Sequence, residues 1–222
     1  MSSIASNISE IKKMLPFGVE LVAVSKFQSI DTIMEAYNAG QLHFGENRPQ
    51  EFAAKMPKMP QDIVWHFVGH LQTNKVNMVV GKAALIHSID SERLLWAVNS
   101  EAAKQGIQQR CLLEIHIATE ESKSGFSCEE ALALISSSEF INMQGVIICG
   151  IMGMASNTPD EQQIRTEFRT LKQFYNHLKQ TPFAHNPNFC HLSMGMSGDW
   201  PIAVEEGSTL IRVGTQIFGS RS

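Results

Sequence analysis

Short apolar runs rich in strand-forming residues alternate with longer segments of mixed polarity along the whole chain. Uniformly apolar runs of this length are typical of strands that are buried on both faces. Because longer segments separate the runs, we expect parallel pairing, since parallel strands require a crossover connection. Eight strands are predicted on this basis, at residues 21–24, 42–44, 64–68, 84–87, 111–117, 145–151, 190–192 and 210–213.

Helices are predicted in the longer segments, and several have recognisable start signals. Ser127 and Glu130 form a predicted capping box, in which the two side chains satisfy backbone N–H groups reciprocally. The segment 158–161, Thr-Pro-Asp-Glu, predicts a cap at its threonine and proline at the first helical position. Asp90 is the predicted cap of another helix. The helix after residue 161 has an apolar face made by Ile164, Phe168, Leu171, Tyr175 and Leu178.

Eight strands alternating with helices predict a closed (β/α)₈ TIM barrel of the α/β class, with residues 1–222 as a single domain. The chain is shorter than the ~250 residues typical of such barrels, which leaves little room for an additional domain. An open doubly wound sheet is the alternative architecture. Its GxGxxG phosphate fingerprint is missing, because residues 149–153 contain only a G-x-x-G.

Charge and composition exclude several classes of function. The formal charge of -4 at pH 7 provides no basic footprint for nucleic acid or for an anionic membrane. No apolar run is long enough to span a bilayer, and residues 1–15 lack the basic-then-apolar order of a signal peptide. The 4 cysteines are scattered without a CxxC pair, so we expect reduced thiols and a cytoplasmic protein.

Polar and glycine residues cluster where the predicted strands end, which is where a barrel of this type carries its chemistry. Lys26 ends the first strand. A lysine at this position either extends into water or points into the barrel mouth. In the mouth its ammonium is poorly hydrated, so its pKa falls below the ordinary value and the neutral amine can attack a carbonyl to form an imine.

The loops after the seventh and eighth strands are the usual phosphate site of this fold. Here they contain Ser193 and Ser197-Gly198, then Gly214-Thr215. Small residues let backbone N–H groups approach an anion, and the hydroxyls donate further bonds. Either loop alone is equally consistent with an ordinary turn. Two such loops at the same corner of the barrel favour a phosphate site.

Arg212 lies on the last predicted strand, two residues before Gly214. An inward arginine must find an acceptor, because it does not lose its proton. One interpretation is a buried salt bridge to a core carboxylate such as Glu114. The other is a hydrogen bond to a pyridine nitrogen. Together with an imine-forming lysine and a phosphate site, the second interpretation describes a pocket for pyridoxal 5′-phosphate (PLP).

Other polar residues have simpler interpretations. His66 and His70 have the spacing of a helical metal pair, but Gly69 between them breaks that geometry and no third ligand stands at a companion spacing. The loop 122–125 is interpreted as solvated. The methionines at 152, 154, 194 and 196 are interpreted as core filling rather than as a ligand slot.

At this level of detail the chain resembles the PLP homeostasis protein family, whose barrel is similar to the N-terminal domain of alanine racemase. The resemblance covers nearly the whole chain in the right order. It rests on VAVSK (22–26), HFGEN (43–47), WHFVGHLQTNK (65–75), IHSID (86–90), ESKSGF (121–126), LSMGMSGDW (192–200) and GSTLIRVGTQIFG (207–219).

The resemblance implies a role for each candidate residue. Lys26 matches the lysine that forms the internal aldimine with PLP, Arg212 matches the arginine facing the pyridine nitrogen, and Asn47 matches a residue beside the cofactor. It also implies a monomer that takes part in intracellular PLP homeostasis, with apo PLP enzymes as possible recipients and no established turnover. The phosphate-binding positions are Ser193, Ser197, Gly214 and Thr215.

An amino-acid racemase is the alternative function. Racemisation on PLP needs two bases on opposite faces of the substrate, and in alanine racemase the second base is a tyrosine from an additional domain in a dimer. The tyrosines of this chain, Tyr37 and Tyr175, lie in predicted helices. Arg212 would also leave the pyridine nitrogen unprotonated and weaken the ring as an electron sink. We therefore expect slow exchange with amines and little or no turnover.

Overall fold

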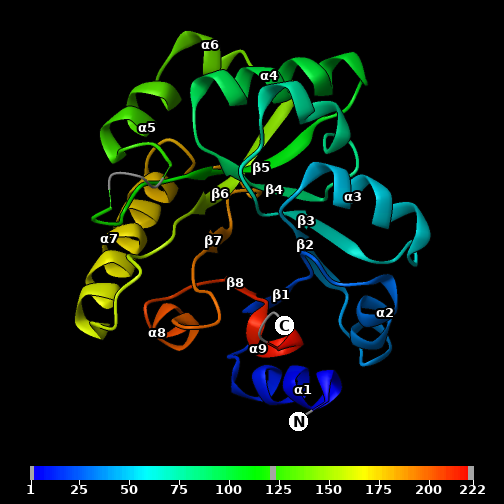
Figure 1. The fold of residues 1–222 in the computed structure, drawn as a ribbon. Helices are drawn as coiled ribbons and strands as arrows, with labels where there is room; N and C mark the ends of the chain where they lie inside the picture. The colour runs from blue at the N-terminus through cyan, green and yellow to red at the C-terminus, as the bar shows by residue number, and fades with distance from the viewer. Residues whose placement is uncertain (1–2, 121–123, 220–222) are drawn as a thin grey trace.

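The computed structural model describes residues 3–120 and 124–219, so the predicted loop 122–125 lies partly outside it. The strands form a closed parallel barrel in the order β1 to β8, with β8 paired to β1 (Figure 1). This architecture confirms the predicted TIM barrel and excludes the open sheet. The strands are β1 (Glu20–Val24), β2 (His43–Glu46), β3 (Val64–Phe67), β4 (Leu85–Ile89), β5 (Gln109–Glu114), β6 (Val146–Met152), β7 (His191–Ser193) and β8 (Leu210–Val213).

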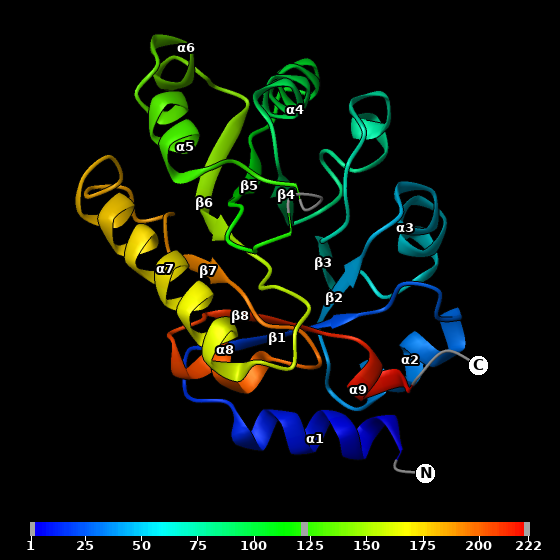
Figure 2. The ribbon, with the colours of Figure 1, turned by 60° about the vertical axis from the view of Figure 1, so that its left-hand side comes forward.

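Helices surround the barrel, as Figures 1 and 2 show from two directions. Each predicted strand is present, with bounds that differ by up to a few residues from the apolar runs. None of the described helices is long and apolar enough to cross a membrane. The helices are α1 (Ile4–Met14), α2 (Ile30–Asn38), α3 (Pro49–Lys55), α4 (Glu92–Lys104), α5 (Cys128–Ile135), α6 (Ser138–Ile141), α7 (Glu161–Gln180), α8 (Trp200–Glu205) and α9 (Thr215–Phe218), with 3₁₀ turns η1 (Met56–Lys58) and η2 (Thr73–Met78).

Helix starts follow the side chains that reach the exposed N–H groups. The capping box is confirmed, because Ser127 and Glu130 exchange hydrogen bonds with each other's backbone N–H. The predicted cap at Thr158 is wrong: Asp160 Oδ1 accepts from the N–H groups of residues 162 and 163, and α7 begins after it. Asp90 is also displaced as a cap, by Ser91. In both segments a neighbouring oxygen lies nearer the orphan N–H groups.

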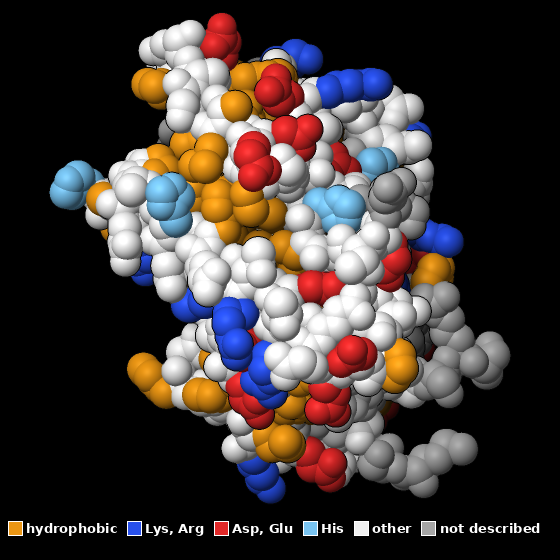
Figure 3. Space-filling model, turned by 90° about the vertical axis from the view of Figure 1, so that its left-hand side faces the viewer, with side chains coloured by type: hydrophobic (Ala, Val, Ile, Leu, Met, Phe, Trp, Pro, Cys, Tyr) orange, Lys and Arg blue, Asp and Glu red, His pale blue; other side chains and the backbone are white. Residues whose placement is uncertain are grey.

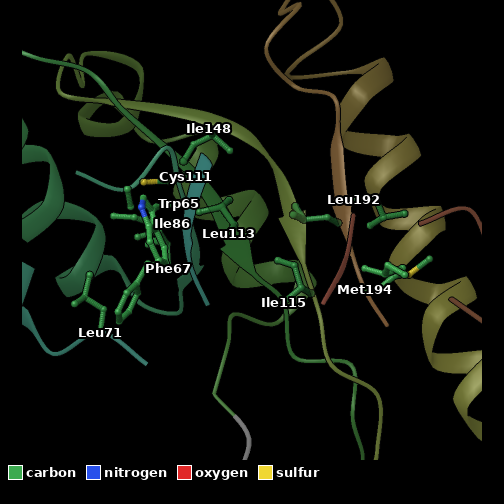
Figure 4. Packing of buried hydrophobic residues seen from close by; sticks show 14 of the residues in the cluster. Trp65, Phe67, Leu71, Ile86, Cys111, Leu113, Ile115, Ile148, Leu192 and Met194 are labelled. Carbon is green, nitrogen blue, oxygen red and sulfur yellow. The ribbon is translucent and has the colours of Figure 1, made fainter. Parts of the chain in front are cut away.

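The apolar core has two layers. The larger layer fills the space between the strands and the helices, where Trp65, Ile86 and Leu113 pack together (Figure 4). The predicted apolar face of α7 is buried in this layer. A smaller cluster fills the barrel itself and consists of Val22, Leu85, Leu112, Cys149, Met152 and Leu210. Polar side chains that enter the barrel above this cluster must therefore find partners within the protein.

The outer surface is mixed in character. Figure 3 shows the face that carries α5 to α7, where acidic side chains border an apolar patch. Ile141, at the end of α6, is 71% exposed. At the opposite side of the barrel, α1 lies beside α9, and Asn7 Nδ2 donates to the carbonyl of Ile217 at 2.9 Å. This contact fixes the C-terminal helix next to the end of β8.

Candidate functional site

A cavity of about 470 Å³ opens at the carboxyl ends of the strands. This is the end of the barrel at which sequence reasoning placed the chemistry. Six of the seven candidate residues line it together, although they come from the segments after β1 and β2, the β7–α8 loop, β8 and its end, and α9. They are Lys26, Asn47, Ser197, Arg212, Gly214 and Thr215.

Lys26 follows β1 in a tight turn that lies against the cavity. The N–H of Gln28 donates to the carbonyl of Ser25 at 3.0 Å and closes the turn. Phe27, directly after the lysine, has a φ of 64°, a conformation that is an outlier for a bulky residue. Lys26 itself is half-buried and lines the cavity. The backbone of this turn is therefore held in an unusual shape around the candidate lysine.

A charged clamp, formed by Glu46, Glu51 and Lys55, holds this turn from behind. Lys55 Nζ lies 2.9 Å from Glu46 Oε1 and 3.3 Å from Glu51 Oε2. The same ammonium donates to the carbonyl of Ser25 at 3.0 Å, and Ser25 Oγ donates to Glu46 Oε1 at 2.7 Å. Glu51 Oε2 accepts the N–H of Phe27 at 3.0 Å. The clamp therefore binds the peptide groups on both sides of the lysine.

Electrostatics differ within the clamp. Burial raises the pKa of Glu46, more than the hydrogen bonds from Lys55 and Ser25 lower it. Glu51 lies nearer to solvent, and although burial acts to raise its pKa, the N–H of Phe27 and the Lys55 charge lower it on balance. Glu46 therefore loses its proton at a higher pH than an ordinary glutamate, whereas Glu51 loses its proton at a lower pH.

Arg212 on β8 is 5% exposed and lines the cavity. It donates to Ser193 Oγ at 2.5 Å and to the carbonyl of Gly153 at 3.2 Å. Burial lowers the pKa of the guanidinium to about 10, so it stays charged at neutral pH. Glu114, the alternative partner, accepts instead from Ser124 Oγ at 3.1 Å, and burial raises the pKa of its carboxyl to about 7. Arg212 thus donates to neutral oxygens.

Ser193 is the one candidate that does not line the cavity. It is fully buried on β7, where its hydroxyl supports Arg212 and lies 3.0 Å from His87 Nδ1. The structure therefore places this serine one layer below the cavity, beneath the guanidinium. Its position at the start of the glycine-rich loop predicted an anion contact, but the strand continues through Ser193, so its side chain enters the barrel.

A histidine column, formed by His43, His66 and His87, continues from Ser193 through the barrel interior. His87 Nε2 lies 2.9 Å from His66 Nδ1, and His66 Nε2 lies 3.0 Å from His43 Nδ1. At the outer end, His43 Nδ1 lies 3.3 Å from Glu20 Oε2. The three histidines come from neighbouring strands, so the register of the barrel aligns their rings.

Burial keeps the inner histidines of this column neutral. It lowers the pKa of His66 to about 3 and that of His87 well below its ordinary value. A neutral imidazole offers one donor and one acceptor. Because Arg212 already donates to Ser193 Oγ, the serine hydroxyl can donate to His87 Nδ1. Each histidine can then donate from Nε2 to Nδ1 of the next, which satisfies the contacts from Ser193 to His43 and leaves no proton between His43 Nδ1 and Glu20.

Small residues and one hydroxyl shape the far side of the cavity. Ser197 Oγ accepts from the N–H groups of Gly214 at 3.2 Å and Gln216 at 3.5 Å, so it ties the two predicted phosphate loops together. A Cβ at Gly198 would meet no atom within 4 Å, which leaves that stretch of backbone open to a ligand. The two loops therefore meet at one corner, as predicted from their sequences.

Asn47 lies at the end of β2 and contributes an unsatisfied acceptor. Its Oδ1 is buried and has no hydrogen-bond partner among the described residues. Gly69 makes this position possible, because a Cβ there would lie 2.2 Å from the carbonyl oxygen of Asn47. A buried amide oxygen without a partner is uncommon and calls for a ligand or water.

Some lining residues were not predicted for this role. His70, considered only as a metal ligand, lines the cavity and bonds Asp90 Oδ2 through Nδ1 at 2.8 Å, while His66 lies inside the barrel, so the structure does not bring the two histidines together. Met154 and Met196 also line the cavity, whereas Met152 and Met194 are core residues. Their position at strand ends was the available signal.

Solved structures similar to this chain share the barrel and, in part, its sequence. PipY of Synechococcus elongatus PCC7942, a COG0325 family member solved with PLP bound, is 36% identical, with a TM-score of 0.87 over 98% of this chain and 100% of PipY. Its structure without PLP gives a TM-score of 0.91. Alanine racemase of Clostridium difficile 630 is 13% identical, with a TM-score of 0.75 over 99% of this chain and 56% of the racemase, and shares the fold.

Sequence relatives give the same assignment over most of the chain. The pyridoxal phosphate homeostasis protein of Aquifex aeolicus is 37% identical over 203 residues, which cover 91% of this chain and 87% of the relative. That of Vibrio alginolyticus is 35% identical and covers 100% of this chain and 99% of the relative. The family model for the alanine racemase N-terminal domain matches residues 1–222. The chain therefore belongs to the alanine racemase N-terminal domain family and, within it, to the pyridoxal phosphate homeostasis proteins.

Proposed function

We propose that this chain binds PLP in the cavity at the carboxyl ends of its strands, covalently through Lys26, and takes part in PLP homeostasis. The observation that carries the proposal is the meeting of an amine, a buried guanidinium and two small-residue loops in one cavity of about 470 Å³. A relative with 36% identity over nearly its whole length, PipY, was solved with PLP bound.

The residues present fit this cofactor chemically. PLP carries an aldehyde, a pyridine nitrogen and a phosphate, and the cavity offers a partner for each. Lys26 supplies the amine, and Arg212 supplies a fixed N–H donor for a ring nitrogen. The loops at Ser197-Gly198 and Gly214-Thr215 offer small residues for an anion. Asn47 Oδ1, buried without a partner, is suited to accept a hydrogen bond from the ligand.

When bound, PLP supplies an electrophilic carbon and a ring that withdraws electrons. The residues of this chain determine how far that chemistry proceeds. Lys26 Nζ would bond to the aldehyde carbon with loss of water, which requires the neutral amine. Arg212 keeps its own proton at neutral pH, with a pKa of about 10, and so would donate to the ring nitrogen without protonating it. An unprotonated ring is a weak electron sink, which supports a binding role.

The same geometry supports the absence of racemase turnover. A second base is required on the face of the substrate opposite the lysine. Tyr37 donates to Asp62 at 2.9 Å, and Tyr175 stacks on Phe189 in the outer core with ring centroids 5.3 Å apart. Neither tyrosine lines the cavity. We infer that this chain exchanges PLP with incoming amines slowly and turns over amino acids little, if at all.

The test is to locate the covalent bond. Purified protein is incubated with PLP, its visible spectrum is recorded, and the sample is reduced with borohydride and analysed by peptide mass spectrometry. We expect a yellow protein with the pyridoxyl mass on Lys26 and a colourless Lys26→Ala variant. Lys58→Ala, a change at an exposed lysine in η1, is the matched control and stays yellow. A label distributed over surface lysines, with Lys26 unmodified, would reject the proposal.

A further inference from the structure

The charged clamp is bonded to the turn around Lys26, and none of its three members lines the cavity. Its inner member, Glu46, is fully buried on β2, and Lys55 is 9% exposed at the end of α3. A buried ion pair is weak evidence for stability, because removing both charges from water offsets much of their attraction. The convergence of three charged side chains on a single turn therefore calls for a specific reason.

The turn supplies that reason. A hydrogen bond from Lys55 Nζ fixes the carbonyl before Lys26, and Glu51 Oε2 fixes the N–H after it. Two held peptide groups leave the backbone of the residue between them little freedom to rotate. The direction of its Cα–Cβ bond is then set by the clamp. A lysine with a long, flexible side chain reaches one point reproducibly only if its base is fixed.

The backbone conformation of Phe27 is strained, so contacts from the surrounding residues must hold the turn in place. Its φ of 64° lies in the left-handed region, where a bulky side chain costs free energy. Glu51 accepts the Phe27 N–H, and Arg48 lies over the Phe27 ring at 4.4 Å while also pairing with Glu51 Oε1 at 3.5 Å. The surroundings thus over-determine a conformation that the isolated turn would leave.

We propose that Glu46, Glu51 and Lys55 are positioning residues, which fix the turn at residues 25–28 so that the Lys26 amine is presented to an aldehyde in the cavity. This inference rests on the proposed function, since it assigns the clamp to the same lysine. The clamp residues do not line the cavity, and they act through the two peptide groups that flank Lys26. Loss of the clamp is expected to slow the condensation of Lys26 with the aldehyde and to leave the cavity itself in place.

Glu51→Ala is the main test, because Glu51 is the most exposed member of the clamp and its loss leaves the Glu46–Lys55 pair intact. We expect the rate at which PLP condenses with Lys26 to fall about tenfold. Glu51→Gln retains an oxygen that can accept the Phe27 N–H, so it is expected to recover most of that rate. A rate for Glu51→Ala within about twofold of the wild type would overturn the inference.

A second readout needs no PLP. Amide hydrogen exchange is followed in the peptide containing residues 25–28, and the reactivity of Lys26 toward a small acylating reagent is measured by mass spectrometry. In Glu51→Ala, we expect faster exchange of the Phe27 amide and altered Lys26 reactivity. Unchanged exchange at this amide would contradict the clamp directly. If the wild type fails to take up PLP on Lys26 while this exchange result holds, the proposed function fails and the clamp does not.

Matched variants separate positioning from stability. Glu167→Gln weakens another buried carboxylate, which accepts from Ser156 N and Oγ at 2.6 and 2.7 Å and does not line the cavity. It is expected to lower the melting temperature and leave the condensation rate unchanged. Where Lys55→Met does not fold, Glu46→Gln/Lys55→Met removes both charges together and tests the same contact to Ser25. If all folded variants show condensation rates that merely follow their melting temperatures, the clamp is structural only.

Discussion

Two buried polar assemblies lie behind the cavity, and they provide partners for their buried polar groups in opposite ways. Below Lys26 lies the charged clamp, in which Lys55 is bonded to Glu46 and Glu51. Below Arg212 lies the histidine column, joined to the guanidinium through Ser193. The clamp satisfies buried groups with opposite charges, whereas the column satisfies them with neutral donors and acceptors in series.

Depth explains the difference. The clamp lies between the barrel and α3, with the side chain of Glu51 24% exposed, so water can still screen part of its charge. The column crosses the barrel interior, where His87 is fully buried and His66 is 3% exposed. A charge there would lack both water and a partner. The comparison indicates that the barrel holds an ion pair at its wall and keeps His66 and His87 neutral in its interior, where Arg212 at the cavity is the charged group that this column supports.

Removing one charge from the clamp is expected to have the largest effect on stability. Lys55→Met leaves the Glu46 carboxylate buried without its counter-ion, and breaking such a pair typically costs about 3–5 kcal/mol. His66→Gln in the column breaks neutral contacts and should cost about 1–3 kcal/mol. Urea unfolding at neutral pH measures both.

The double variant Glu46→Gln/Lys55→Met is the control for this prediction. It removes the stranded charge and keeps an amide that can accept from Ser25 Oγ. We expect it to recover a large part of the stability lost in Lys55→Met, because the penalty comes from the unpaired charge. Equal stability losses in Lys55→Met and His66→Gln would show that the two assemblies do not differ in this way.

Acid should distinguish the two assemblies by the sign of their effects. The pKa of His66 is about 3 in the fold and ordinarily 6.5, so the unfolded chain binds a proton that the folded chain excludes between these values. Stability from this histidine is full above the higher value and falls by up to about 1.4 kcal/mol per pH unit on acidification through that window. His66→Gln should therefore flatten the loss of stability between about pH 6 and pH 4.

The pH dependence of the stability contributed by Glu46 has the opposite sign to that of His66. The pKa of Glu46 is raised in the fold, so its contribution is full below the pKa of the unfolded carboxyl and is lost as pH rises through the folded value. Removing this carboxylate should make the loss of stability on acidification steeper. Urea unfolding of wild type, His66→Gln and Glu46→Gln across this range gives the three slopes. The same slope in all three would contradict the assignment of neutral and charged assemblies.

Local patterns predicted the fold and the cavity wall well, because they depend on short-range signals. The apolar runs and their polar ends identified all eight strands and the end of the barrel that carries the cavity. Lys26 and Arg212 could be placed from their positions after β1 and on β8, whereas Asn47 was placed by the family resemblance. Helix caps were less predictable, since Ser91 and Asp160 each compete with a neighbouring oxygen for the same N–H groups.

The supports below the cavity could not be predicted, because they join residues distant in sequence. His87 meets Ser193 across a separation of 106 residues, and Lys55 reaches Ser25 across 30. The order of the three histidines in one column depends on strand register, which no local pattern specifies. Ser193 was predicted to bind phosphate because its loop contains glycine and serine. Whether its side chain points into the cavity or into the barrel interior depends on the residue at which β7 ends.

Ser193→Ala probes the junction between the column and the cavity, with a smaller expected effect. The change removes an acceptor from the buried Arg212 and a partner from His87. Arg212 keeps its bond to the carbonyl of Gly153, so it stays in place with more freedom. We expect PLP to bind about tenfold more weakly, which corresponds to one hydrogen bond to a charged group. Titration followed by absorbance measures the affinity.

The labelled residue is the control for that titration. Borohydride reduction of Ser193→Ala should still place the pyridoxyl group on Lys26, because the charged clamp is untouched. An affinity equal to that of the wild type would mean that Gly153 alone holds the guanidinium. Loss of the label from Lys26 would mean that the two assemblies are coupled rather than independent.

The outer end of the column should matter least. The side chain of Glu20 is 51% exposed, and its Oε2 lies 3.3 Å from His43 Nδ1, farther than the 3.0 Å between His43 Nδ1 and His66 Nε2. His66 can donate to this nitrogen and leave no proton there for Glu20. A half-exposed contact of this kind contributes little, so Glu20→Gln should change the free energy of unfolding by less than about 0.5 kcal/mol. A loss above about 1 kcal/mol would place a charge on His43 and end the description of the column as neutral throughout.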